Sequence, residues 1–160
     1  MSRLPVVTTA LRLGGFVLLA GLAGCMGMDG GGGGLPAGLT ASMATPGASL
    51  DRATALSVVN QYRATTGAAA LADDPGLDAQ AQALATTYAR TGKAPPLPAG
   101  VTGLRASAGY ANFAETFSGW RNSPADAAVL ADQTARRAGL AAIYDANSTY
   151  GVYWILVLAG

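Results

Sequence analysis

The chain has 160 residues, of which 51% are hydrophobic, 12% charged and 7% aromatic. So few charged and so many apolar residues exclude a fully disordered protein, and the length fits one domain with accessory segments. Only one segment is continuously apolar, and it is shorter than the roughly 20 residues of a membrane-spanning helix, which excludes a polytopic membrane protein. The net charge is +1, and loss of the leader described next leaves eight basic and nine acidic residues, too few positive charges for a nucleic-acid partner.

Residues 1–24 are typical of an export signal, with Arg3 and Arg12 ahead of or within an apolar run and small residues at its end. The run closes on Leu22-Ala-Gly-Cys25, which resembles the lipobox of bacterial lipoproteins. The resemblance implies cleavage before Cys25 and acylation of that cysteine, and several acyl chains anchor a protein stably to a membrane. Met26 follows, and not the Asp that retains many lipoproteins at the inner membrane, so we expect an outer-membrane location if the host is diderm. The alternative is an ordinary secretory signal that leaves one unpaired thiol.

A tether follows the cysteine. Residues 25–48 contain five consecutive glycines, Gly30–Gly34, and further glycines and prolines without apolar periodicity, which indicates a flexible linker. A phosphate-binding glycine loop is excluded because no strand precedes the glycines and no helix follows them. The remaining residues, 49–160, are predicted to form the folded domain, and they are enough to bury a real core.

Helices dominate the first part of this domain. Apolar residues at helical spacing predict helices over 50–66, with Ser49 or Asp51 as cap, and over 75–90, entered through Asp74-Pro75. Residues 93–111 are rich in proline and glycine and are predicted to be a loop. Two further helices are expected over 112–121 and from Ser123-Pro124, as cap and first turn, to about residue 131.

Two strands end the chain. The runs 138–144 and 151–158 have strand character, and the polar residues 145–150 between them predict a hairpin. The second run is apolar on both faces, as expected of a strand covered by helices on each side. Helices followed by an antiparallel hairpin give an α+β domain.

The order of these segments and their local sequences resemble the CAP superfamily, named after cysteine-rich secretory proteins, antigen 5 and pathogenesis-related 1 proteins, in its bacterial single-domain form. The resemblance covers nearly all of residues 50–160 and implies an α-β-α sandwich with about four helices and a small antiparallel sheet. The matching pieces are Leu56-Ser-Val-Val-Asn-Gln-Tyr-Arg63 with Gly67, Leu71-Ala-Asp-Asp-Pro-Gly-Leu77 with Ala81-Gln82 and Ala85, Glu115-Thr-Phe-Ser-Gly-Trp-Arg-Asn-Ser-Pro124, and Ala138-Gly-Leu-Ala141 with Tyr153-Trp154.

The chain departs from the family at the cavity residues, which commonly are two histidines and two acidic residues able to bind a divalent metal. Asp126 stands where one His is expected, the sequence around Lys93 supplies no imidazole for the other, and Leu104-Arg105 stand where the family has Glu-Asn. Glu115 is the one candidate left for the acidic pair. We therefore expect no metal and no cofactor.

Little catalytic chemistry remains open, because a chain without histidine builds neither a Ser-His-Asp nor a Cys-His nucleophile. A Ser–Lys pair would depend on Lys93, the only lysine, which is better explained as a solvated loop charge. Glu115 and Asp126, on consecutive helices, are the weak candidates for a carboxylate pair acting in glycan or peptide hydrolysis, although each also suits the first turn of its helix.

Binding is the other possibility. Most aromatic residues in the second half are expected in the core, whereas Tyr110 and Tyr150 are expected to be partly exposed. Arg105, Arg136 and Arg137 could form a basic rim, but ordinary surface solvation is the better explanation. The sequence thus favours a lipid-anchored, non-catalytic envelope domain that binds a lipid-like ligand, a cell-wall polymer or a protein, and not nucleic acid. The alternative is an envelope hydrolase that uses Glu115 and Asp126.

Overall fold

The structure, a computed structural model, describes residues 35–160. The predicted signal peptide, Cys25 and the run of five glycines lie outside the described residues. The elements within them give the predicted α+β class. In chain order they are α1 (Ala37–Thr40), α2 (Arg52–Thr65), β1 (Ala72–Asp73), α3 (Pro75–Thr91), β2 (Gly103–Ala108), α4 (Phe113–Asn122), α5 (Pro124–Leu130), β3 (Arg137–Tyr144) and β4 (Val152–Ala159).

Side-chain caps fix where three of the helices begin. Asp51 accepts a hydrogen bond from the Thr54 amide at 3.0 Å, Asp74 one from the Gly76 amide at 2.8 Å, and Asn112 starts α4 in the same way. Each satisfies an amide that has no partner inside the helix. Ser123 is the N-cap residue of α5, as predicted, but its side chain makes no capping hydrogen bond. The proline that follows Ser123 suits the first turn of α5.

The sheet has four strands in the order β1-β3-β4-β2. β4 pairs antiparallel with β3 and with β2, and the two-residue β1 pairs parallel with β3. All eight residues of β4 are buried, as expected for a central strand with two apolar faces. The sheet is therefore mixed, larger than the expected hairpin by β1 and β2.

β2 lies inside the stretch predicted as loop. Glycine, alanine and serine make up most of its six residues, and it carries no β-branched or aromatic side chain that would predict a strand. Its pairing with β4 makes it an edge strand of the sheet.

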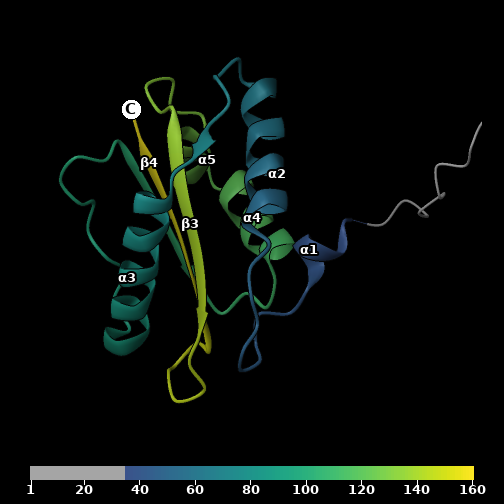
Figure 1. The fold of residues 1–160 in the computed structure, drawn as a ribbon, viewed down its shortest axis with the longest axis vertical. Coiled ribbons are helices and arrows are strands. Elements are labelled where there is room, and N and C mark those ends of the chain that lie inside the picture. Colours follow the sequence, from purple (N-terminus) through teal and green to yellow (C-terminus); the bar gives the residue numbers. More distant parts are fainter. Residues whose placement is uncertain (1–34) are drawn as a thin grey trace, which may run out of the picture. The chain divides into compact units, whose positions relative to one another are not determined.

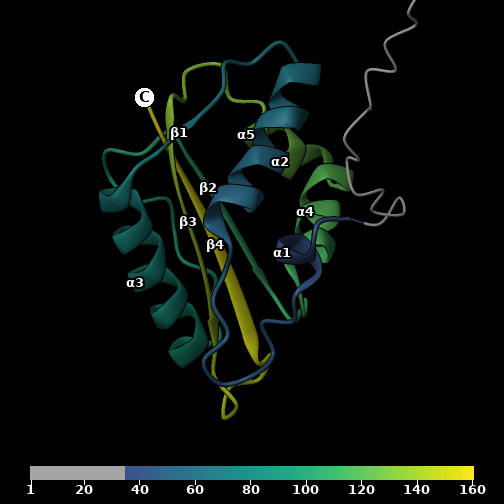
Figure 2. The same ribbon diagram turned by 45° about the vertical axis from the view of Figure 1, so that its right-hand side comes forward.

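Helices cover both faces of the sheet, which confirms the α-β-α sandwich. α3 lies along one face, and α1, α2, α4 and α5 lie on the other (Figures 1 and 2). No helix among residues 35–160 has the length and apolar character needed to cross a membrane.

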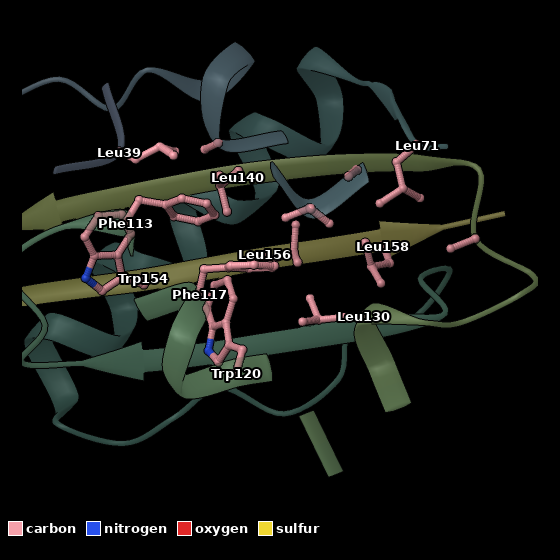
Figure 3. Packing of buried hydrophobic residues seen from close by; sticks show 14 of the residues in the cluster. Leu39, Leu71, Phe113, Phe117, Trp120, Leu130, Leu140, Trp154, Leu156 and Leu158 are labelled. Carbon is pink, nitrogen blue, oxygen red and sulfur yellow. The ribbon is translucent and has the colours of Figure 1, made fainter. Parts of the chain in front are cut away.

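Each face of the sheet has its own hydrophobic core. The larger one packs the aromatic rings of α4 against alternate residues of β4, and its larger side chains are labelled in Figure 3. The smaller one joins α3 to the opposite side of β3 and β4. The rings of Phe113 and Trp154 have centroids 6.0 Å apart, so the predicted core role of these aromatics is confirmed.

The predicted tether ends earlier than residue 48. Residues 37–40 form α1, and Leu39 and Met43 are 2% and 3% exposed within the larger core. These two side chains lie four residues apart among glycines and prolines, so the sequence shows no helical periodicity from which their burial could be predicted. The segment from α1 to residue 48 is thus part of the folded domain.

Two polar side chains of α2 fix the loops around it. Asn60 accepts a hydrogen bond from the Leu71 amide and donates one to the Leu71 carbonyl. Arg63 is fully buried and donates to the carbonyl oxygens of Ala69, Leu130 and Ala135 at 2.8, 2.7 and 3.2 Å. Burial lowers the pKa of the Arg63 guanidinium, but backbone oxygens replace its lost water. Arg63 therefore joins α2 to the end of α5 and to the segment that follows it.

Candidate functional site

Glu115, the first carboxylate singled out from the sequence, lies in the first turn of α4 and is exposed. Its Oε2 accepts a hydrogen bond from the Ala111 amide at 3.2 Å, while its own amide donates to Asn112 Oδ1 at 3.0 Å. This reciprocal arrangement resembles a capping box, which stabilises a helix start. Glu115 thus has a structural explanation.

Asp126, the second carboxylate, lies in the first turn of α5 and forms an ion pair with Arg105 of β2. Both side chains are partly buried, at 29% and 25% exposure. Glu115 and Asp126 therefore contact different partners, the backbone before α4 and the edge strand respectively.

The metal that the family resemblance implies does not fit these residues. The chain has no histidine, Asp126 already neutralises a guanidinium, and residues 35–160 contain no group of three His, Cys, Asp or Glu side chains able to hold an ion. Leu104, which stands where the family has an acidic residue, is buried and apolar.

The remaining charged candidates are three arginines and one lysine. Arg105 pairs with Asp126, Arg137 pairs with Asp74 at 2.6 Å, and Arg136 donates to the Gln133 carbonyl at 2.7 Å. Local partners thus account for each arginine of the suggested basic rim. Lys93 is exposed in the loop after α3.

An apolar groove lies between α2 and α4 on the outer side of the larger core. It consists of two hollows of about 360 and 390 Å³ that share Val58, Gln61, Phe117 and Arg121. The first hollow extends past Ala114 and Ser118 to Leu35, Pro36 and Leu39, beside α1, and the second extends toward Thr65 at the end of α2. We call this surface the α2–α4 groove.

Helical spacing explains why the two walls face each other. The residues from α2 are Val58, Gln61, Tyr62 and Thr65, and those from α4 are Ala114, Phe117, Ser118 and Arg121. Both sets have the spacing i, i+3, i+4 and i+7, which puts each set on one side of its helix. The ring of Tyr62 meets that of Phe117 edge to face, with centroids 6.1 Å apart, and forms part of the floor.

The groove has one formal charge. Arg121 lies in the last turn of α4 and is exposed, and it lines both hollows, whereas the other lining side chains are apolar or neutral. An open apolar groove with one cation at its side suits an apolar ligand that carries an anionic group. Sequence reasoning missed this site, because it did not compare the outward-facing residues of the two helices and left Arg121 unexamined. The matched i, i+3, i+4, i+7 sets of the two helices are the signal that would have found it.

The chain is similar to known proteins in sequence pattern and in fold. Residues 56–158 match the model of the CAP family, described as the cysteine-rich secretory protein family. No curated protein sequence matches the chain.

Two solved structures share the fold at low sequence identity. An outer surface protein from Borrelia burgdorferi is similar with a TM-score of 0.56 and 14% identity, and the match covers 68% of this chain and 92% of that protein. An extracellular protein containing an SCP domain from Bacillus anthracis is similar with a TM-score of 0.55 and 16% identity. That match covers 68% of this chain but only 40% of the Bacillus protein.

Proposed function

Because the chain belongs to the cysteine-rich secretory protein family, we propose that it is a non-catalytic binding domain that a lipid anchor displays on the cell envelope. The α2–α4 groove is the observation that carries the proposal. The local partners of Glu115 and Asp126 support a binding role over the alternative of an envelope hydrolase.

The proposed ligand is a single-chain amphiphile with an acidic head. Leu35, Pro36 and Val58, which line the first hollow and are exposed or partly exposed, offer an apolar path, along which an alkyl chain gains about 0.8 kcal/mol for each CH₂ group removed from water. Arg121, at the side of this path, attracts the acid, although an exposed ion pair contributes at most about 1 kcal/mol. Most of the affinity therefore comes from the alkyl chain.

Titration with dodecanoic acid and with dodecanol tests the groove. The Cys25→Ser chain is used, so that the acyl chains of the anchor do not compete. Filling the groove with Ser118→Trp should weaken binding of both probes at least tenfold. Arg121→Gln should weaken binding of the acid up to about fivefold and leave the alcohol unchanged, because only the acid is charged.

Arg90→Gln is the matched control, because Arg90 is also an exposed arginine in the last turn of a helix, α3. It should bind both probes like the parent chain. Equal binding by the parent chain and Ser118→Trp would refute the groove as the site.

The anchor is a separate part of the proposal. It rests on Leu22-Ala-Gly-Cys25, and the names of the outer surface and extracellular proteins that share the fold support an envelope location. Met26 favours the outer membrane in a diderm host. In cells fed with labelled palmitate, the protein that retains Cys25 should carry the label, and Cys25→Ser should not. Undiminished label in Cys25→Ser would contradict lipidation at this residue.

A further inference from the structure

The outer edge of β3 leaves part of its backbone without a partner. The Asp145 amide donates to the Gly151 carbonyl at 2.8 Å, where the antiparallel pairing of β3 with β4 ends. Because the hydrogen bonds of an antiparallel pair recur at every second residue, the residues in between point their N–H and C=O groups away from β4. On β3 these residues are Ala138, Leu140, Ala142 and Tyr144.

The first two of these residues have partners on the outer side of β3, and the last two do not. β1 pairs with the start of β3 and ends opposite Ala138, and the Leu140 amide donates to Asp78 Oδ1 of α3 at 2.8 Å. Within residues 35–160, no hydrogen bond uses the outward N–H or C=O groups of Ala142 and Tyr144. A strand edge with free donors and acceptors is a template for pairing with another strand.

A hollow of about 300 Å³ lies along this uncovered edge. Gln82 of α3 and Arg52 of α2 both line it, and these helices cover opposite faces of the sheet (Figure 2), so the hollow opens at the edge of β3 and not on a face. The segment between α1 and α2 supplies the remaining wall. We call this hollow the β3-edge slot, and the lining residues that the argument uses are Ser49, Arg52, Gln82, Ala142 and Tyr144.

That remaining wall is a tight turn. The Ala48 amide donates to the Thr45 carbonyl at 3.2 Å, and Gly47 has a φ of +79°. This is the conformation of a type II turn, which favours glycine in its third position and proline, here Pro46, in its second. Thr45, Gly47 and Ala48 line the slot. The wall therefore has a fixed shape before a ligand binds, which lowers the entropy cost of binding.

Arg52 places a cation at one end of the slot. Its Nε lies 3.1 Å from Asp78 Oδ2, and its side chain is 50% exposed. Asp78 is also the carboxylate that accepts from the Leu140 amide, so Arg52 lies at the Leu140 end of the uncovered edge. The remaining N–H donors of the guanidinium can bind a second carboxylate, supplied by a ligand.

We propose that the β3-edge slot binds a short extended peptide as an added strand, antiparallel to β3 and with its terminal carboxylate at Arg52. The free groups of Ala142 and Tyr144 lie about 7 Å apart, which is the distance at which an extended peptide repeats its own N–H and C=O groups on one side. The edge from Leu140 to Tyr144 spans roughly 13 Å, the length of about four residues. An antiparallel peptide ends at the Leu140 end, where Arg52 lies. Main-chain hydrogen bonds then supply the affinity, as in other cases of strand addition.

Other exposed features of the domain offer less to a peptide. At the opposite edge of the sheet, Arg105 of β2 donates from Nε to the Leu104 carbonyl and pairs with Asp126, so a backbone acceptor and the cation are already engaged. Tyr110 and Tyr150 are 38% and 53% exposed, which confirms the partial exposure predicted for them, but neither lines the slot. The slot also shares no lining residue with the α2–α4 groove, so the two sites can be tested separately.

The test uses the full chain carrying Cys25→Ser as the parent and a library of acetylated tetrapeptides built from Ala, Ser, Thr and Val, with free carboxyl ends. Native mass spectrometry detects the complexes. Because the main chain is recognised, the parent should bind most members at about 1 mM total peptide. The same library with amidated ends should bind up to about fivefold more weakly, because only the carboxylate can pair with the exposed Arg52.

N-methylated peptides distinguish an added strand from simple attraction of a carboxylate. Methylation of every second nitrogen removes the N–H groups on one side of an extended peptide and leaves those on the other side. One of the two alternate sets should therefore abolish binding, and the other should leave it unchanged. Equal binding by both methylated sets would overturn the proposal.

A pair of proline variants places the peptide on the chain. Ala142→Pro removes an outward N–H and fills the edge with the proline ring, while the bonds of β3 to β4 remain, since proline is tolerated at such positions of an edge strand. It should weaken binding at least about tenfold. Ala106→Pro is the matched control, because Ala106 lies on the opposite edge strand, β2, between residues that bond to β4. It should bind like the parent, and loss of binding in Ala106→Pro alone would overturn the proposal.

A second pair of variants keeps the test decisive if Ala142→Pro proves unstable in thermal unfolding. Gln82→Trp fills the slot from α3, and Thr87→Trp places the same ring on an exposed position of α3 outside the slot. Gln82→Trp should weaken binding at least about tenfold, and Thr87→Trp should bind like the parent. A Gln82→Trp chain that binds like the parent would overturn the proposal, as would a parent that binds no member of the library.

Discussion

The joint between α3 and β3 permits a sharp test of the packing, through Gly139→Ala. A Cβ on Gly139 would lie 2.0 Å from the carbonyl carbon of Leu77 and 2.3 Å from the amide nitrogen of Asp78. Both atoms belong to the backbone of α3, so no side-chain rotation relieves the clash. The helix would have to move away by roughly 1.5 Å to reach ordinary contact distance.

Such a movement would also strain the hydrogen bonds that cross this joint. The Asp74 amide donates to the Ala138 carbonyl at 3.0 Å, and the Leu140 amide donates to Asp78 Oδ1 at 2.8 Å. Overpacking of a core costs about 1–3 kcal/mol, and a backbone clash belongs at the upper end. We therefore expect the free energy of unfolding to fall by about 3 kcal/mol and Tm to fall by roughly 10 °C.

Urea and thermal denaturation followed by circular dichroism measure this loss. Gly100→Ala is the control, because a Cβ there has no atom within 4 Å and meets only the positive φ of +81°, which costs about 1 kcal/mol. Gly139 does not have a positive φ, so the stability lost in Gly139→Ala comes from the steric clash alone. If Gly139→Ala were no less stable than Gly100→Ala, the close packing of α3 on β3 would be refuted.

Three further substitutions test other parts of the fold and its response to pH. Arg63→Met should lower the free energy of unfolding by about 3 kcal/mol, measured in urea, because the carbonyls of Ala69 and Leu130 lose the donor that Arg63 supplies, whereas Ala135 keeps Arg136; a loss below about 1 kcal/mol would contradict this. Leu39→Ala should cost about 2–4 kcal/mol, and unchanged stability would show that α1 lies outside the core. Hydrogen bonds from the Leu77 amide and Arg137 hold the pKa of the Asp74 carboxyl below its ordinary value in the folded protein. The stability that this carboxylate contributes is present above the pKa of unfolded Asp, near 4, and is lost as the pH falls through the folded pKa. Between about pH 5 and 2, Asp74→Asn should therefore lose less stability than the parent, and parallel pH profiles would contradict the assignment.

The helices were predictable where local chemistry decides the structure. The caps Asp51, Asp74 and Asn112 and the proline after Asp74 lie in the sequence beside the residues that they stabilise. α3 was therefore placed to within one residue at its end. β4 was also predictable from the sequence, because an uninterrupted apolar run is typical of a strand covered on both faces.

The elements that sequence reasoning missed depend on distant partners. β2 has little strand propensity of its own and exists through its pairing with β4, about fifty residues later in the chain. α1 is a single turn in a segment rich in glycine and proline, and only its packing against α2 and α4 explains why Leu39 is buried. In both cases tertiary contacts outweigh the local signal.

For the candidate site too, the sequence predicted what depends on residue type and missed what depends on contacts between elements. The sequence was sufficient to show that the chain lacks the family's histidines and to single out Glu115 and Asp126. It did not show that Asp126 pairs with Arg105, because the two residues lie on different elements. The α2–α4 groove needs the distance and angle between two helices, which no spacing within one helix supplies.

Native mass spectrometry of the Cys25→Ser chain purified from a bacterial host shows whether the groove holds a ligand. If the groove binds fatty acids, part of the protein retains one fatty-acid-sized mass, and the chain that also carries Ser118→Trp, purified in the same way, does not. When dodecanoic acid is added, the Cys25→Ser chain should form a species with one bound ligand, and the chain that also carries Ser118→Trp should not. A bare protein mass in the parent, both as purified and after addition of the acid, would contradict a binding function of the groove.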